Sequence, residues 1–287
     1  MFVRIPQMEP VCYLNGKILP VADACVNVYD IGLLRGFGIY EAFMTYSRKP
    51  FMLADHLARF RRSAKAMSLK VPASDEEIRS AVDALVEKSI PSYKEAVIRI
   101  ILTGGNALDG IEYNYDTPTF YILVEEFKPF PSTLYTDGCP LTVFEQQRQF
   151  PESKTTNYIQ AVLLQEAREK AGAIEILYVS NGKVLEAATS NFFIVKNGVL
   201  ITAKSGILEG VTRKVTIEVA RPHFSVEIRD VSVDEMYDAD EAFITSSFKE
   251  IVPIVRVGEK TIGSGKVGDV TKRLMKLFRD YTVHVGR

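Results

Sequence analysis

Cysteine and histidine are scarce in this chain of 287 residues. Its three cysteines, Cys12, Cys25 and Cys139, are odd in number, far apart and without a Cys-x-x-Cys pair. They support neither a disulfide framework nor a zinc ribbon. The three histidines are scattered singly, so we expect structural or surface roles for them and no metal ion.

Long apolar runs and an excess of one charge are also missing. No apolar stretch reaches the roughly 18 residues that would suggest a membrane span, and residues 1–6 contain no apolar core of signal-peptide length. Lys and Arg number 35 against 36 for Asp and Glu, so the overall charge recruits neither nucleic acid nor an anionic membrane. We expect a soluble, cytoplasmic protein whose basic sites are local.

Apolar residues are abundant enough for a sizeable core, since 47% of the chain is hydrophobic. Two prolines, Pro129 and Pro131, interrupt the chain and predict an interdomain linker over residues 128–133. The linker separates a small N-terminal α+β domain, residues 1–127, from a large cofactor-binding domain, residues 134–287. In the first domain we expect two helices and five strands without a repeated βαβ rhythm. The helices are expected at 54–67 and after Ser74, and the strands at 11–14, 17–20, 40–46, 96–102 and 119–125.

The second domain begins with apolar residues at helical spacing. Ile159, Val162, Leu163 and Ala167 predict one amphipathic helix that ends at Gly172. Two Asn-Gly pairs, at 181–182 and 197–198, then predict type I′ hairpins. The domain is therefore expected to be rich in antiparallel strands.

Lys154 is the first candidate for chemistry, because it precedes this helix and Tyr158 follows four residues later. One helical turn would bring both side chains to one face, where a partly buried amine could form a Schiff base and the phenol could bond a cofactor's ring oxygen. A solvated lysine ahead of a helix is the alternative for a lysine considered alone.

Glu186 is the second candidate, in Leu185-Glu186-Ala187-Ala188-Thr189-Ser190-Asn191. A carboxylate held against a pyridine nitrogen would keep that nitrogen protonated and make the ring an electron sink. An ordinary glutamate of an edge strand is the alternative.

Phosphate-binding candidates occur at three places. The turn 206–210 runs into a helix that begins near Val211 or Thr212, and a helix N-terminus binds anions. Ser246 and Ser247 follow a strand at 242–244 and could add donors. The helix 54–67 carries Arg59 among three arginines, which form either a surface basic face or a phosphate clamp. The Ser and Thr residues are open to a second interpretation, as caps of turns.

Six motifs in this order resemble the class IV, fold type IV aminotransferases, a group that contains branched-chain aminotransferases, D-amino acid aminotransferases and aminodeoxychorismate lyases. The resemblance covers nearly the whole chain. It implies a small α/β sandwich domain followed by a larger pseudobarrel domain, in a homodimer. The motifs are Gly38-x-Tyr40-Glu41, His56-x-x-Arg59-Phe60, Lys154-x-x-x-Tyr158, Glu186 followed by Ser190-Asn191-Phe192-Phe193, Leu208-x-Gly210-Val211-Thr212-Arg213 and Glu250-Ile251-x-Pro253.

The resemblance also implies a role for each matching residue. Lys154 would carry pyridoxal 5'-phosphate as an internal aldimine and move the α-carbon proton, in a ping-pong reaction that uses a keto acid such as α-ketoglutarate. Tyr158 would bond the ring oxygen, Glu186 the pyridine nitrogen, and Leu208 would pack on the ring. The residues implied for the phosphate are Arg59, Val211, Thr212, Ser246 and Ser247.

Two other functions are weighed against the transaminase. An aminodeoxychorismate lyase would share this cofactor site but eliminate instead of transfer. A noncatalytic binding protein is disfavoured by the intact Lys154, Tyr158, Glu186 and Arg59. A dinucleotide site at 35–38 is excluded because no strand-to-helix unit with a later acidic residue surrounds it.

The substrate is expected to contact Tyr40, Arg99 and Arg35. The stretch 102–108 lacks the Arg-x-His pair with which well-known D-amino acid enzymes hold the substrate carboxylate. Arg35 stands where atypical D-amino acid aminotransferases place an arginine, and its fork could replace that pair. A surface arginine before a glycine turn is the alternative. The sequence thus predicts small or branched aliphatic amino acids as substrates and leaves their hand open between L and D.

Overall fold

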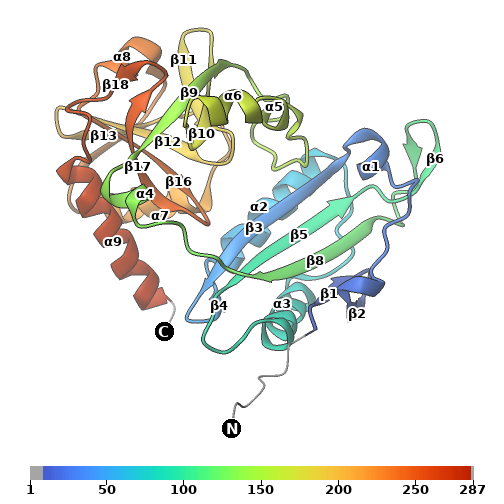
Figure 1. Cartoon of the computed structure of the whole chain (residues 1–287). Helices are drawn as coiled ribbons and strands as arrows, with labels where there is room; N and C mark the ends of the chain where they lie inside the picture. The colour runs from blue at the N-terminus through green and yellow to red at the C-terminus, as the bar shows by residue number, and fades with distance from the viewer. Residues whose placement is uncertain (1–8, 286–287) are drawn as a thin grey trace. The chain divides into compact units, whose positions relative to one another are not determined.

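The computed structural model describes residues 9–285 and divides the chain into two compact units (Figure 1). Unit 1 takes the chain through Lys128 together with Ser153–Asn157, and unit 2 takes Pro129–Glu152 and Tyr158–Val285. The short segment around Lys154 therefore belongs to the first unit, although the chain on both sides of it belongs to the second. None of the helices within the described residues is both long and apolar enough to cross a membrane.

Unit 1 is built on an antiparallel sheet with the strand order β2-β1-β8-β5-β3-β4. The helices α2 and α3 lie against it, α2 beside β3 and α3 beside β8 and β1 (Figure 1). The elements are β1 (Val11–Leu14), β2 (Lys17–Pro20), a 3-10 turn (Val21–Asp23), α1 (Ile31–Arg35), β3 (Gly38–Tyr46), β4 (Lys49–Pro50), α2 (Leu53–Ala66), α3 (Asp75–Ser89), β5 (Ala96–Thr103), β6 (Ala107–Asp109), β7 (Glu112–Tyr113) and β8 (Thr119–Glu126).

Local sequence explains why α3 begins where it does. Ser74 Oγ accepts a hydrogen bond from the Glu77 backbone N–H at 3.2 Å, and Glu77 Oε2 accepts one from the Ser74 backbone N–H at 2.7 Å. This capping box satisfies two N–H groups that the first turn leaves without helical partners. Ile78, Val82 and Leu85 then face the sheet and join its core.

Unit 2 is built on a sheet with the order β14-β13-β12-β16-β17-β9-β10-β11-β15. Strand β11 also pairs with β12, so the path β12-β16-β17-β9-β10-β11 closes into a ring. The expected α+β fold with a barrel-like second sheet is confirmed. The elements are α4 (Thr133–Thr136), β9 (Cys139–Glu145), α5 (Ile159–Leu163), α6 (Gln165–Lys170), β10 (Glu175–Ser180), β11 (Lys183–Ala187), β12 (Asn191–Lys196), β13 (Val199–Thr202), α7 (Val211–Ala220), β14 (Ser225–Ile228), β15 (Val231–Ser232), α8 (Val233–Tyr237), β16 (Glu241–Ser246), β17 (Glu250–Val257), β18 (Lys260–Thr261) and α9 (Asp269–Val285).

Both predicted Asn-Gly hairpins are present. Asn181 and Asn197 have φ values of 51° and 50°, and the glycines that follow them also have positive φ. These values match the type I′ turn, whose twist fits two antiparallel strands. The turns join β10 to β11 and β12 to β13, so the first hairpin fixes the strand that carries Glu186.

The prediction of a single amphipathic helix after Tyr158 was wrong. Two short helices, α5 and α6, replace it and meet at Leu164. The apolar side chains Ile159, Val162 and Leu163 are 67%, 66% and 71% exposed. The helical spacing was real, but the face it defines is not buried in unit 2.

Candidate active site

Lys154 lies beside the first residues of β3 and not on a helix. The Tyr40 backbone N–H donates to Lys154 O at 2.9 Å, the Thr156 N–H donates to Gly38 O at 2.9 Å, and Thr155 forms a bridge with Ile39. The predicted helical turn from Lys154 to Tyr158 was therefore wrong, because residues 154–156 pair with the edge of β3. Tyr158 is the N-cap of α5 and belongs to unit 2.

Gly38 makes this close approach possible. A Cβ at Gly38 would lie 3.0 Å from Leu102 O and 3.2 Å from Thr156 Oγ1, both tight contacts. On the other side, the Lys154 backbone N–H donates to Ser63 Oγ of α2 at 3.1 Å. The backbone of Lys154 is thus fixed by one strand and one helix.

The Lys154 amine lies over the ring of Tyr40, with Nζ 4.4 Å from the ring centroid. This contact is a cation–π interaction when the amine is charged. Arg99 is opposite Ala42 on the neighbouring strand, so it shares the sheet face of Tyr40. The Arg99 guanidinium forms an ion pair with Glu125 on that face.

The opposite face of β3 presents Glu41 to helix α2. Arg59 donates from Nε to Glu41 Oε1 at 2.8 Å and from Nη2 to Oε2 at 2.7 Å, and His56 Nδ1 lies 2.8 Å from Oε2. All three side chains are buried. The helical spacing of His56, Arg59 and Ser63 places them on one face of α2, so this helix supports both the carboxylate and Lys154.

The two ionisable partners of Arg59 have shifted pKa values. Burial alone would raise the pKa of Glu41, but the charge and hydrogen bonds of Arg59 and the hydrogen bond from His56 lower it to about 2. Burial lowers the pKa of His56, and the charges of Arg59 and Lys154 act in the same direction against Glu41. At neutral pH the pair is therefore an anionic glutamate and an uncharged histidine that donates from Nδ1.

In unit 2, Glu186 is a buried residue of β11 and not a solvated edge residue. Its Oε1 accepts two hydrogen bonds from Arg148, one of them from Nε at 2.9 Å. Its Oε2 accepts one from the Leu208 backbone N–H at 3.0 Å, with Asn191 Nδ2 at 3.4 Å. The carboxylate is therefore held in one orientation by donors from three segments.

Sequence reasoning missed Arg148 and Tyr178, which both lie near Glu186. Arg148 follows β9 among polar residues, where no local pattern marks it. Burial raises the pKa of Tyr178, with Tyr158, Glu175 and Glu186 acting in the same direction and Arg148 against them. Tyr178 thus shares the electrostatic surroundings of Tyr158 and Glu186.

The N-terminus of α7 lies beside this carboxylate. Its N-cap, Gly210, provides no side-chain acceptor for the first N–H groups of the helix, at Val211 and Thr212. Leu208 lies two residues earlier, and its carbonyl accepts a hydrogen bond from Asn191 Nδ2 at 2.7 Å. The arrangement leaves the positive end of the helix dipole open to an anion.

The turn after β16 carries Ser246 and Ser247, both half-buried. Ser246 Oγ accepts a weak hydrogen bond of 3.3 Å from the Lys249 N–H. Just before them, Thr245 Oγ1 is the only side-chain oxygen or nitrogen among the described buried groups for which no hydrogen-bond partner is found. The turn is anchored by an ion pair of 2.8 Å between Lys249 and the buried Glu175 of β10.

Arg35 is exposed at the end of α1, and its Nη1 donates to Leu34 O at 2.9 Å. Asp30 fixes the start of this helix. Its buried carboxylate accepts from the Gly32 N–H at 2.7 Å and from the hydroxyls of Thr103 and Thr119 at 2.9 and 2.5 Å. The position of Arg35 is therefore set by a buried polar anchor five residues away.

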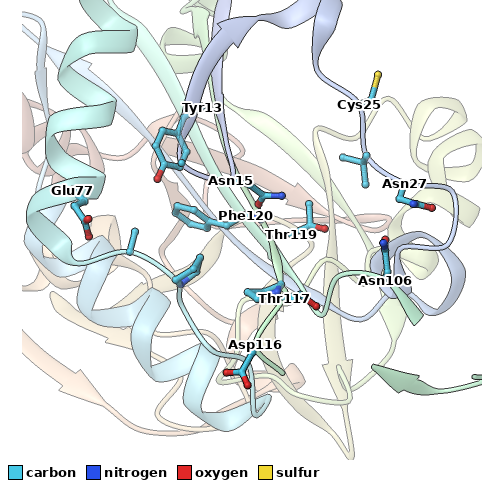
Figure 2. A pocket seen from close by; sticks show the side chains of 15 residues that line it. Tyr13, Asn15, Cys25, Asn27, Glu77, Asn106, Asp116, Thr117, Thr119 and Phe120 are labelled. Atoms are coloured by element: carbon cyan, nitrogen blue, oxygen red, sulfur yellow. Dashed lines mark hydrogen bonds between the residues drawn. The ribbon is translucent and has the colours of Figure 1, made fainter. Parts of the chain in front are cut away.

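Figure 2 shows a cavity of about 610 Å³ in unit 1 that involves none of the predicted cofactor residues. Tyr13, Asn15 and Phe120 line it, and Glu77 and Asp116 are its charged residues. No lysine or arginine is found among the described residues that line it. Such a lining does not suit a phosphate group.

Comparison with known proteins identifies the family. The family model for class IV aminotransferases matches residues 38–257. A putative branched-chain-amino-acid aminotransferase of Methanocaldococcus jannaschii is 34% identical over 285 residues, covering 96% of this chain and 97% of the relative. An aminodeoxychorismate lyase of Bacillus subtilis is 29% identical with 93% of each chain covered, and a D-alanine aminotransferase of Bacillus licheniformis is 27% identical with 93% and 95% covered.

The fold agrees with these sequences. The solved structure of the branched-chain amino acid aminotransferase of Escherichia coli matches with a TM-score of 0.88 and 26% identity, covering 95% of this chain and 94% of that one. A second branched-chain amino acid aminotransferase, solved with pyridoxamine 5'-phosphate, also matches with a TM-score of 0.88 and 26% identity. The chain therefore belongs to the class IV aminotransferases, the pyridoxal phosphate-dependent transaminases of fold type IV.

Proposed function

We propose that this protein exchanges amino groups between an aliphatic amino acid and a keto acid such as α-ketoglutarate, with Lys154 as the catalytic residue. The observation that carries the proposal is the buried carboxylate of Glu186, held by Arg148 and the Leu208 N–H. A buried anion fixed in this way suits a protonated pyridine nitrogen.

The residues present fit pyridoxal phosphate in three respects. Lys154 offers an amine against the Tyr40 ring. Glu186 offers an anion for the ring nitrogen. The start of α7, without a side-chain cap, and the partnerless Thr245 hydroxyl beside Ser246 offer donors suited to a phosphate.

The proposed holding groups follow from this fit. Arg59 and the segment at Val211 and Thr212 would bind the phosphate together with Ser246 and Ser247. Tyr158 would donate to the ring oxygen, and Leu208 would pack on the ring. Arg59 is already oriented by Glu41, so its guanidinium is pre-organised.

When bound, pyridoxal phosphate supplies an aldehyde that condenses with amines and a ring that withdraws electrons from the substrate α-carbon. Lys154 Nζ would take the proton from that carbon and pass it to the cofactor, as transfer of the amino group requires. Glu186 would keep the ring nitrogen protonated. Tyr40, Arg99 and Arg35 are proposed to contact the substrate. The first keto acid leaves before the second one binds, which gives ping-pong kinetics.

Half-reactions test the proposal. Adding an amino acid such as leucine or alanine to the holoenzyme should convert the cofactor absorbance to that of the amine form, with release of the keto acid. Adding α-ketoglutarate should then restore the original spectrum. An elimination product formed without any need for a keto acid would instead favour a lyase, the activity of the Bacillus subtilis relative, and would contradict the proposal.

We also propose that the protein is a homodimer. Unit 1 exposes large apolar side chains on two neighbouring segments, residues 28–34 and 107–115. The segments are joined by backbone hydrogen bonds from Ile31 N–H to Gly105 O at 2.8 Å and from Ala107 N–H to Tyr29 O at 2.9 Å. An apolar surface of this kind favours a protein partner. Its exposed residues are Val28, Tyr29, Leu33, Leu34, Leu108, Ile111 and Tyr115.

A cytoplasmic location is proposed on the state of the cysteines. Cys12 and Cys139 are buried, Cys25 is exposed, and all three are free. Free thiols suit a reducing compartment.

A further inference from the structure

The carboxylate of Glu186 accepts hydrogen bonds from three residues, Arg148, Leu208 and Asn191. Arg148 reaches Oε1 with two N–H groups, and Leu208 N–H reaches Oε2 at 3.0 Å. The Asn191 amide is the weakest partner, at 3.4 Å from Oε2. An ionised carboxylate accepts through about four lone pairs, and an N–H of a bound ring could replace the long Asn191 contact at Oε2.

Arg148 is itself fixed in place. Its Nη2 donates to Pro151 O at 2.9 Å, and its side chain is 16% exposed. The neighbouring Gln147 donates to Gly206 O at 3.2 Å, which ties the same segment to the turn before α7. The guanidinium therefore meets Glu186 from a rigid position, with little side-chain entropy left to lose.

Two other polar groups near Glu186 have different hydrogen bonds. Arg213 of α7 is also buried and its charge interacts with that of Glu186, but its guanidinium donates to Thr202 Oγ1 and Ala203 O, at 3.4 and 2.9 Å. Tyr178 of β10 has its pKa raised by burial, so it remains an uncharged phenol at neutral pH. Arg148 forms an ion pair with Glu186 through Nη2 and Oε1.

We propose that Arg148 is a positioning residue that keeps Glu186 anionic and directs Oε2 at the nitrogen of the cofactor ring. The inference rests on the proposed function. A cation on Oε1 opposes transfer of the ring proton to Glu186, because protonation would leave Arg148 buried without its counter-charge. The proton then stays on the ring nitrogen, where it is needed for withdrawal of electrons.

The test compares Arg148→Met and Arg148→Lys in the wild-type and Glu186→Gln backgrounds. Arg168→Met is a matched control, because Arg168 is a partly buried arginine of unit 2 that bonds the carbonyls of Ala173 and Ile174. Three quantities are measured: the dissociation constant of pyridoxal phosphate, the absorbance of the bound cofactor against pH, and the thermal unfolding of the apoprotein.

We expect Arg148→Met to weaken cofactor binding on the order of tenfold or more, the size of losing charge-assisted hydrogen bonds. Without the cation, Glu186 takes up a proton more readily, so the acid-side change in cofactor absorbance moves to higher pH. Arg148→Lys, which keeps the charge, should recover part of both effects. In the Glu186→Gln background, Arg148→Met should add little further loss of affinity.

A purely structural arginine would give another pattern, in which Arg148→Met lowers apoprotein stability like Arg168→Met but leaves affinity and the pH dependence of the absorbance unchanged. Equal losses of affinity in both Glu186 backgrounds would also overturn the inference. If Arg148→Met does not fold, the neutral variant Arg148→Gln supplies the same comparisons. If the wild-type half-reactions fail, the proposed function itself is contradicted. If wild-type transfer is normal and the Arg148 variants are unaffected, only this inference is contradicted.

Discussion

Glu41 is the residue that organises the buried polar cluster of unit 1. It binds Arg59 through both oxygens and contacts His56 through one. Its pKa of about 2 lies below the ordinary value of 4.5, so its ionisation stabilises the folded state. The stabilisation is present above pH 4.5 and is lost as the pH falls toward 2, and it amounts to ~3 kcal/mol at neutral pH.

Glu41→Gln should therefore lower the free energy of unfolding of the apoprotein by about 3 kcal/mol at pH 7, because Arg59 keeps its charge in a buried place. The difference from wild type should shrink as the pH is lowered below 4.5. Urea unfolding at a series of pH values measures the difference in stability at pH 7 and its change with pH. Glu87→Gln, on the exposed side of α3, is the control and should change stability by about 0.5 kcal/mol at most. A difference that does not vary with pH would refute the assigned charge state.

Arg35 is the residue proposed to set whether the L or the D form of the substrate is preferred. If its fork binds the substrate carboxylate, the half-reaction with D-alanine or D-leucine should be preferred and Arg35→Ala should slow it by roughly a hundredfold, since bidentate charged contacts contribute about 3 kcal/mol. If Arg35 is only the exposed end of α1, L-leucine should be preferred and the substitution should have little effect. Paired L and D isomers of alanine, leucine and glutamate measure this. A D preference that survives Arg35→Ala would contradict the role given to Arg35.

Helix α7 depends on a close contact at its N-cap residue, Gly210. An added Cβ at Gly210 would lie 2.1 Å from Asn191 Oδ1, although the φ and ψ of −66° and 138° at Gly210 suit alanine. Asn191 would have to move, and with it the hydrogen bond from its amide to Leu208 O. The start of α7 and the residues around Glu186 therefore pack against each other.

We accordingly expect Gly210→Ala to weaken pyridoxal phosphate binding about tenfold and to destabilise the apoprotein by about 1–3 kcal/mol. In an Asn191→Ala background the clash is removed, so the added alanine should cost much less stability. Cofactor titration and thermal unfolding of the four proteins measure this. Fully additive effects would show that Gly210 and Asn191 do not interact as described.

Elements with strong local chemistry were predictable from the sequence. The Ser74 capping box and the Asn-Gly turns at 181 and 197 act within a few residues, so their structures follow from local physics. The prediction of one helix after Tyr158 was wrong because the spacing of apolar residues defines an apolar helix face but does not show whether other residues pack on that face. Lys154 was placed on a helical turn because its partners, Gly38 and Tyr40, lie more than 110 residues earlier.

Part of the candidate site had no local signal at all. Arg148 stands in a polar stretch, and its ion pair with Glu186 joins positions 38 residues apart. Glu41 lay within a quoted motif, but its bonds to His56 and Arg59 appear only when α2 packs on β3. Such roles arise from tertiary contacts, which a single sequence does not display.

The proposed homodimer is a property of the whole molecule and rests on the apolar surface of unit 1. Leu33→Glu combined with Leu108→Glu places two charges on that surface, where the side chains are each 69% exposed. Burying these charges in an interface would cost several kcal/mol, so the variant should be monomeric. Light scattering measures the mass. Tyr93→Glu, at an exposed residue in the turn between α3 and β5, is the control and should have the same mass in solution as the wild-type protein. A double variant that remains dimeric would place the interface elsewhere.

Lys154 is proposed to carry the cofactor of this transaminase. Borohydride reduction of the yellow holoenzyme, followed by peptide mass mapping, tests it most directly, because reduction fixes the cofactor to the lysine that binds it. We expect a single adduct on Lys154. Lys154→Ala should retain some cofactor through the phosphate-binding groups yet form no adduct and transfer no amino groups. An adduct on any other lysine, or transfer activity that survives Lys154→Ala, would contradict it.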